Sequence, residues 1–206
     1  MIKFKVSAPG RMILCGEHVI MYGKHAVAVS LDLRTTLKFD ELINPTNIIK
    51  IEFPDVNLSL NLSLELIQNF FFTNDLRFLF ENPFLLLKHV QYFITINGLW
   101  NTYEQRYGLQ TFLFLLLYIA HEKELDIKSF HVHLTTQLPI NVGFGSSTSF
   151  AVCLAACFLH WSRLQRGDHN GFTTEKYEFR NTLCTLRKIY RIMCTRRITI
   201  CAHAIM

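Results

Sequence analysis

The first 60 residues alternate between apolar and polar positions, which is the pattern of half-buried β-strands. Residues 2–7 are rich in Ile, Phe and Val, and Ala8-Pro9-Gly10 then predicts a turn. Further apolar, β-branched runs follow at residues 12–14, 26–33, 35–39 and 48–53. This part of the chain is therefore predicted to be mostly sheet.

From Leu64 onward the apolar residues recur at spacings of three and four, which predicts a layer of helices. Asn82-Pro83 interrupts the helical pattern within this layer. The later segments are predicted as a buried helix at 110–121, a short strand at 130–134, a helix at 148–164 and a loop at 166–174. A loop that carries glycines joins the strand to the last helix.

Composition is typical of a globular protein, because 50% of the 206 residues are hydrophobic and can bury one sizeable core. The length alone is compatible with one domain or two small ones. The most apolar run, residues 112–120, is much shorter than the roughly 20 residues that span a bilayer. The first residues lack the pattern of a signal or transit peptide, so we expect a cytoplasmic protein without a membrane partner.

The net charge of +5 is unevenly distributed. Residues 176–206 hold seven Lys or Arg and a single acid, whereas the rest of the chain is close to neutral. The body is therefore not expected to bind a polyanion, and we expect no nucleic-acid partner.

Cysteine and histidine offer two candidate metal sites, and a structural role without metal is favoured for both. Cys153 and Cys157 lie four residues apart among apolar neighbours, which favours core cysteines. His131 and His133 share one face of the strand at 130–134, but no third ligand stands at a suitable spacing. Solvated strand histidines are the preferred interpretation.

The segment Gln137 to Ser147 carries the candidate chemistry. Gly143 and Gly145 flank Phe144, and two serines then open a helix whose free N–H groups point back into the loop, as in an anion site. The spacing matches neither a Walker motif nor a Gly-x-Gly-x-x-Gly dinucleotide motif. An ordinary turn followed by an N-cap serine, which stabilises a helix by about 1 kcal/mol, remains the alternative from these residues alone.

Two motifs resemble those of the GHMP kinases. Residues 7–18 read Ser-Ala-Pro-Gly-Arg-Met-Ile-Leu-Cys-Gly-Glu-His, and Tyr-Gly-Lys at 22–24 and Ala-Val-Ala-Val-Ser-Leu at 26–31 follow them. Residues 139–147, Pro-Ile-Asn-Val-Gly-Phe-Gly-Ser-Ser, resemble the second motif of the family, Pro-x-x-x-Gly-Leu-Gly-Ser-Ser. Together with the segments between them, the resemblance covers about residues 4–178.

The resemblance implies an α+β fold. Residues 1–178 are expected to form the amino-terminal, ATP-binding domain of a GHMP kinase, with the fold of ribosomal protein S5 domain 2 and a mixed sheet covered by helices. Residues 179–206 are expected to form a divergent basic tail that does not resemble the family, and the carboxy-terminal domain is expected to be missing from these 206 residues.

The first motif is closest in sequence to that of family members that phosphorylate mevalonate. The resemblance therefore implies transfer of a phosphoryl group from ATP to the primary hydroxyl of mevalonate in isoprenoid and sterol biosynthesis. ATP is the co-substrate, Mg²⁺ is the cofactor, and a homodimer is the candidate assembly.

The first motif carries three candidate residues. Arg11 stands where the family has a catalytic Lys; it keeps the positive charge but cannot act as a compact, tunable ammonium. Glu17 and His18 match residues that organise the substrate end of the site in the family.

The second motif supplies the nucleotide contacts. Ser147 matches the serine that ligates Mg²⁺, Asn141 replaces a loop glycine, and Phe144 replaces the usual Leu. Asn tolerates a left-handed backbone better than most residues. The expected ATP-binding residues are Asn141, Val142, Gly143, Phe144, Gly145, Ser146, Ser147, Thr136 and Asp55. For Thr136 and Asp55, a plain role at a strand end or turn is the alternative.

Two acidic groups of the family have no counterpart in these 206 residues. They are the Asp of a Gly-Val-Asp-Asn-like segment, which lies near the transferred phosphoryl group, and an upstream Glu that helps to hold Mg²⁺. We therefore expect this chain to be catalytically very weak or inactive. The alternatives are another GHMP small-molecule kinase, such as a phosphomevalonate, galactose or homoserine kinase, and a non-catalytic nucleotide-binding fragment.

Overall fold

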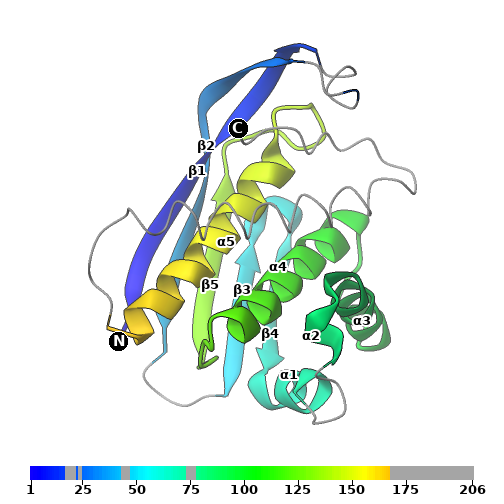
Figure 1. Ribbon diagram of the computed structural model, residues 1–206, viewed down its shortest axis with the longest axis vertical. Helices are drawn as coiled ribbons and strands as arrows, with labels where there is room; N and C mark the ends of the chain where they lie inside the picture. The colour runs from blue at the N-terminus through cyan, green and yellow to red at the C-terminus, as the bar shows by residue number, and fades with distance from the viewer. Residues whose placement is uncertain (17–21, 23–24, 43–46, 73–77, 168–206) are drawn as a thin grey trace.

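The computed structural model describes residues 1–16, 22, 25–42, 47–72 and 78–167. They form a five-stranded sheet with helices on one of its faces (Figure 1). In spatial order the strands are β1 (Lys3–Cys15), β2 (Val27–Glu41), β5 (Phe130–Thr136), β3 (Ile48–Phe53) and β4 (Leu58–Ser63). β3 and β5 are parallel and the other neighbours are antiparallel, so the predicted mixed sheet is confirmed.

Five α-helices and one short 3₁₀ helix accompany the sheet in the described part of the chain. They are α1 (Leu64–Phe71), α2 (Phe78–Glu81), α3 (Pro83–Ile96), α4 (Tyr103–Glu122), α5 (Ser146–Gln165) and η2 (Pro54–Val56). α4 and α5 lie across the sheet, and α1, α2 and α3 gather at the side of α4 (Figure 1). The predicted helices at 110–121 and 148–164 are thus confirmed, the first with an earlier start.

The core lies between the sheet and these two long helices. Alternate residues of the central strands point into it, as strand geometry requires: Leu37, Phe39, Ile49, Ile51, Phe53, Phe130, Val132 and Leu134. Trp161 of α5 is fully buried, with ring centroids 4.8 Å from Phe39 and 4.9 Å from Phe130. These aromatic contacts fix α5 on β2 and β5.

The interruption predicted at residues 82 and 83 is the start of α3. Asn82 has an extended backbone, and its side-chain oxygen accepts a hydrogen bond from the Phe84 N–H at 3.0 Å. Pro83 then occupies the first helical turn, where no N–H is needed. The two residues therefore begin a helix and separate it from α2.

The predicted turn at residues 8–10 is wrong, because β1 runs without a break through these residues. The pairing with β2 instead shifts register between Pro9 and Arg11, as in a β-bulge. β1 is an edge strand, where a proline without an N–H is tolerated. The runs predicted at 26–33 and 35–39 likewise form the single strand β2.

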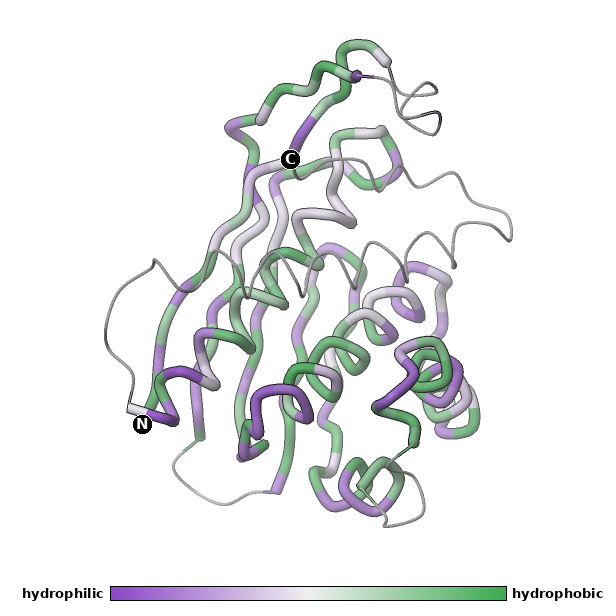
Figure 2. Tube along the Cα trace, viewed as in Figure 1, coloured by the Kyte–Doolittle hydropathy of each residue, from purple (hydrophilic) through white to green (hydrophobic). Residues whose placement is uncertain are grey.

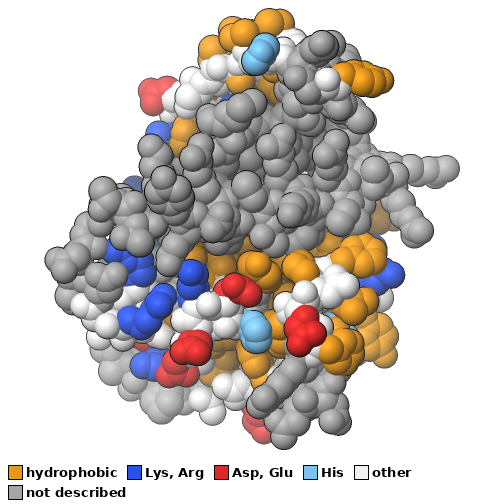
Figure 3. Space-filling model, in the orientation of Figure 1, with side chains coloured by type: hydrophobic (Ala, Val, Ile, Leu, Met, Phe, Trp, Pro, Cys, Tyr) orange, Lys and Arg blue, Asp and Glu red, His pale blue; other side chains and the backbone are white. Residues whose placement is uncertain are grey.

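The far ends of β1 and β2 extend past the helices as a two-stranded arm (Figure 1). The arm is largely apolar (Figure 2), and its exposed side chains include Leu14 (55% exposed) and Val27 (53%). Apolar side chains also gather on the outer helices (Figure 3), where Phe78 and Tyr92 are exposed. Such surfaces are typical of contacts with another domain or chain. Among the described residues, no helix has the length and apolar character needed to cross a bilayer.

The open face of the sheet carries a charged cluster centred on Glu52 of β3. One Glu52 carboxylate oxygen lies 3.1 Å from His131 Nε2 and 3.1 Å from His133 Nδ1. Its other oxygen lies 2.8 Å from Lys50 Nζ. The Lys50 ammonium and the hydrogen bond to His133 lower the pKa of Glu52 to about 2. Both histidines are partly exposed strand residues, and the carboxylate beside them comes from another strand.

Replacing Glu52 by Gln should lower the free energy of unfolding at neutral pH by about 1 kcal/mol, because these ion pairs are partly exposed. The folded pKa of about 2 lies below the ordinary value of 4.5. The ionised carboxylate therefore contributes fully above pH 4.5, and its contribution is lost as the pH falls from 4.5 toward 2. Urea denaturation of the parent and of Glu52→Gln across this window measures the difference.

Glu122→Gln removes the same charge from the exposed end of α4 and serves as the control. We expect a smaller change in stability from it. An equal change in the two variants would show that the cluster adds nothing beyond net charge.

Candidate phosphate-binding site

The loop from Gln137 to Gly145 joins the end of β5 to the start of α5. Three of its residues have a left-handed backbone: Asn141 with φ 65°, Gly143 with φ 81° and Gly145 with φ 74°. Glycine adopts this conformation freely, and Asn adopts it more easily than most residues. Asn141 thus has the left-handed backbone that lets it replace a loop glycine.

The loop ends in the uncapped N-terminus of α5. Gly145 is the N-cap residue and no side chain caps the helix. The first helical hydrogen bond runs from Ser149 N–H to the Gly145 carbonyl at 2.9 Å. The N–H groups of Ser146, Ser147 and Thr148 precede it, so they have no acceptor within the helix and point out of its end. The alternative of an N-cap serine is therefore wrong, and this end of the helix suits an anion.

The loop is held against β1 by a close backbone contact. Arg11 N–H donates to the Phe144 carbonyl at 3.0 Å. A Cβ on the neighbouring Gly10 would lie 2.3 Å from Leu138 Cδ2 and 2.9 Å from the Phe144 oxygen. Only glycine at residue 10 lets the loop come this close.

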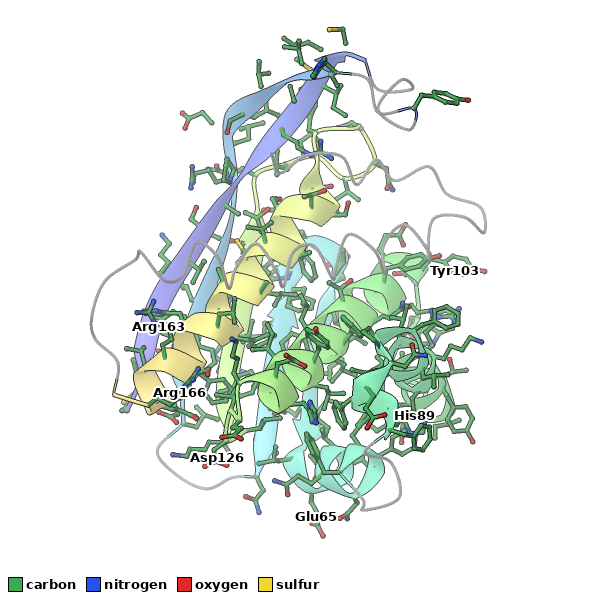
Figure 4. All side chains as sticks on the ribbon, viewed as in Figure 1. Glu65, His89, Tyr103, Asp126, Arg163 and Arg166 are labelled. Carbon is green, nitrogen blue, oxygen red and sulfur yellow. The ribbon has the colours of Figure 1, made fainter. Side chains whose placement is uncertain are left out.

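Arg11 lies beside the N-terminus of α5. Its Cγ is 3.0 Å from the position that a Gly145 Cβ would take, and its Nε and Nη1 atoms are shielded from solvent. The other end of α5 carries Arg163 and Arg166 (Figure 4). The backbone and Cγ of Arg11 thus lie beside the end of α5 where the backbone dipole favours an anion.

Thr136 and Asp55 come together at the entrance of the loop. Thr136 N–H donates to Asp55 Oδ2 at 2.7 Å, and the Thr136 hydroxyl accepts from Leu138 N–H at 3.1 Å. Asp55 is exposed and Thr136 is half-buried. These bonds give both residues a role at the strand end, and their contact with a nucleotide stays a prediction.

Sequence reasoning missed two hydroxyls beneath the loop. Thr35 of β2 is 0% exposed and Ser149 of α5 is 2% exposed, with their Oγ atoms 2.6 Å apart. Thr35 occupies the strand face that also carries Leu37 and Phe39, so a polar residue in that apolar alternation was the available signal.

The cysteine beside these hydroxyls belongs to the core. Cys153 Sγ donates to the Thr35 carbonyl at 3.2 Å, and burial raises the pKa of this thiol to about 12. Cys157 is fully buried as well. The prediction of core cysteines is confirmed for both residues.

Two predicted substrate residues, Glu17 and His18, lie outside the described residues. Ser147 stands in the first turn of α5 and is half-buried. In the described ranges, no group of three or more His, Cys, Asp or Glu side chains is arranged to hold a metal ion. A metal at this end of α5 would therefore draw most of its ligands from a bound phosphate chain and from water.

Comparison with protein families identifies residues 110–172 as a GHMP kinases N terminal domain. The mevalonate kinase of Bos taurus is 31% identical over 158 residues, which cover 75% of this chain and 38% of the relative. That of Dictyostelium discoideum is 34% identical over 163 residues, which cover 75% of this chain and 37% of the relative. The chain thus spans well under half the length of these curated relatives.

Solved structures share the fold. The mevalonate kinase of Methanococcus jannaschii superposes with a TM-score of 0.56 at 17% identity, over 91% of this chain and 47% of the other. The phosphomevalonate kinase of Streptococcus pneumoniae, solved with phosphomevalonate and AMPPNP, has a TM-score of 0.54 at 12% identity, over 90% of this chain and 43% of the other. At these identities the likeness concerns the fold alone.

Gly10→Ala should lower the free energy of unfolding by about 1 to 3 kcal/mol, because the added methyl group collides with Leu138 and with the loop backbone. Gly108→Ala in α4 is the matched control, since its Cβ would meet only ordinary contacts at 3.7 Å or more. Alanine favours helix, so this control should gain up to about 1 kcal/mol. Urea denaturation measures both, and a neutral Gly10→Ala would contradict the close approach.

Proposed function

Because the chain belongs to the GHMP kinase family through its amino-terminal domain, we propose that it binds ATP with Mg²⁺ at residues 141–147. We propose further that it forms the nucleotide-binding part of a kinase that phosphorylates mevalonate in isoprenoid and sterol biosynthesis. The observation that carries the first proposal is the uncapped N-terminus of α5, presented by a left-handed loop beside Arg11. A triphosphate is an anion that such a helix end can hold.

In this proposal, residues of α5 and β1 make different contacts with the triphosphate and its metal ion. The N–H groups of Ser146, Ser147 and Thr148 donate to phosphate oxygens, and Arg11 adds a charge that does not depend on pH near neutrality. The Ser147 hydroxyl offers one neutral oxygen ligand to Mg²⁺, which in kinases neutralises charge on the phosphates. The acidic partners expected from the family have no counterpart in the 206 residues.

Mevalonate is favoured as the substrate by the named relatives. Both relatives described above are mevalonate kinases at 31% and 34% identity, and both alignments cover 75% of this chain. The candidates for the substrate end of the site, Glu17 and His18, belong to the same motif as Arg11. Another GHMP kinase is the second candidate, because the nucleotide loop is shared while the alcohol differs. A substrate panel of mevalonate, phosphomevalonate, galactose and homoserine on a full-length relative separates the two.

Titration of the chain with MgATP by calorimetry tests the nucleotide site, and we expect a dissociation constant at or below about 1 mM. Gly145→Ala should weaken binding at least about tenfold, because its methyl group would strain a left-handed residue and press on Arg11 Cγ at 3.0 Å. Gly98→Ala is the matched control, since Gly98 also has a positive φ but lies in open space away from the loop. Absence of binding at millimolar MgATP would refute the proposed site.

Turnover separates nucleotide binding from catalysis. We expect the 206-residue chain to release ADP from ATP and mevalonate far more slowly than the roughly 1 to 100 s⁻¹ of ordinary kinases. The reason is that the Asp expected from the family near the transferred phosphoryl group has no counterpart in this sequence. A coupled assay of ADP release measures the rate, and turnover in the ordinary range would show that another group replaces that carboxylate.

A further inference from the structure

Beneath the proposed nucleotide site lies a chain of buried hydroxyl groups that connects the two ends of the loop. The Thr136 hydroxyl at the end of β5 lies 2.9 Å from the Thr35 hydroxyl of β2. The Thr35 hydroxyl lies 2.6 Å from that of Ser149 in α5, which donates to the Ser146 carbonyl at 2.9 Å. Thr136 also accepts from Leu138 N–H at 3.1 Å. The chain therefore starts at Leu138, where the loop begins, and ends at Ser146, where α5 begins.

The direction in which each hydroxyl donates its hydrogen is set by the hydrogen bond of its neighbour. A hydroxyl donates only one hydrogen, and Ser149 gives its own to the Ser146 carbonyl. Ser149 must then accept from Thr35, and Thr35 must accept from Thr136. All the bonds thus point from Leu138 toward Ser146. Hydrogen bonds aligned in this way polarise and strengthen one another.

We infer that Thr35 is a positioning residue for the phosphate loop: its buried hydroxyl sets the distance between the two ends of the loop and thereby the direction of the first N–H groups of α5. Thr35 is fully buried, so it can affect a ligand only through its neighbours Thr136 and Ser149. The inference rests on the proposed nucleotide site for its effect on binding. Its effect on the loop is independent of any nucleotide.

Thr35→Val tests the inference, because valine has nearly the same shape and lacks the hydroxyl. In this variant the Thr136 hydroxyl loses the acceptor of its hydrogen, and the Ser149 oxygen loses the donor that faced it. We expect amide hydrogen exchange in residues 138–149 to become at least about tenfold faster without nucleotide, with a clearly smaller change in β3 and β4. MgATP affinity should fall by about tenfold. Thr35→Ser restores the hydroxyl and should restore both quantities.

A second variant separates positioning from stability. Ser149→Ala combined with Thr35→Val removes both partners of the 2.6 Å hydrogen bond, so part of the lost global stability should be recovered, while Thr136 still lacks its acceptor. The loop should nevertheless keep its faster exchange and weaker MgATP binding, because its two ends are still not connected. Val90→Ala in α3, at a buried position distant in sequence from the loop, is the control for destabilisation alone.

The outcomes can be told apart. Unchanged exchange of residues 138–149 in Thr35→Val would overturn the inference, and so would equal effects of Val90→Ala on that segment. Recovery of loop exchange and affinity together with stability in the double variant would also overturn it. Failure of the parent chain to bind MgATP would refute the proposed function, while the exchange measurement would still decide whether Thr35 positions the loop.

Discussion

The contact between the phosphate loop and β1 is the constraint on which the geometry of the site depends. The Phe144 carbonyl accepts a hydrogen bond from Arg11 N–H, and the side chain of Leu138 fills the space in which a residue other than Gly10 would place its Cβ. This contact fixes the loop over the bulge of β1. Since α5 begins at the next residue but one after Phe144, the same contact fixes where the helix starts and which way its free N–H groups point.

The hydrophobic core fixes the rest of the helix. Trp161 and Phe158 pack on Phe130 of the sheet, and Trp161 also packs on Phe39. A site formed by N–H groups gains from such rigidity, because donors already oriented toward a ligand lose little freedom when it binds. The loop itself is exposed at Asn141 and Gly143, so the fold presents accessible backbone groups on a tightly packed support. The support includes Phe39 of β2, which is distant in sequence from the loop.

Sequence reasoning succeeded where the structure is decided locally. The periodicity predicted α5 and β5, and Asn82-Pro83 marked a helix boundary, because capping and side-chain periodicity depend on neighbouring residues. It failed at residues 8–10, where the usual meaning of Pro-Gly as a turn was overridden by pairing with β2. It also missed Thr35 as the partner of Ser149, and Glu52 as the partner of two histidines. These partners lie 114 and about 80 residues apart, so only the packing of α5 on β2 and the register of β3 with β5 bring them together.

The residues around the loop are suited to binding a phosphate and unsuited to accepting a proton. The groups at the end of α5 include backbone N–H donors and the hydroxyl of Ser147, and the side chain of Arg11 starts beside them. Each of them can neutralise or orient a phosphate. A guanidinium stays protonated at any physiological pH and a serine hydroxyl is a poor base, so none of these groups can accept the proton of an alcohol near neutral pH. A lysine at residue 11 could titrate if it were desolvated, whereas arginine keeps only the electrostatic part of that role. Under the proposed function, these groups serve the nucleotide, and removal of a proton from an alcohol requires a group outside this set.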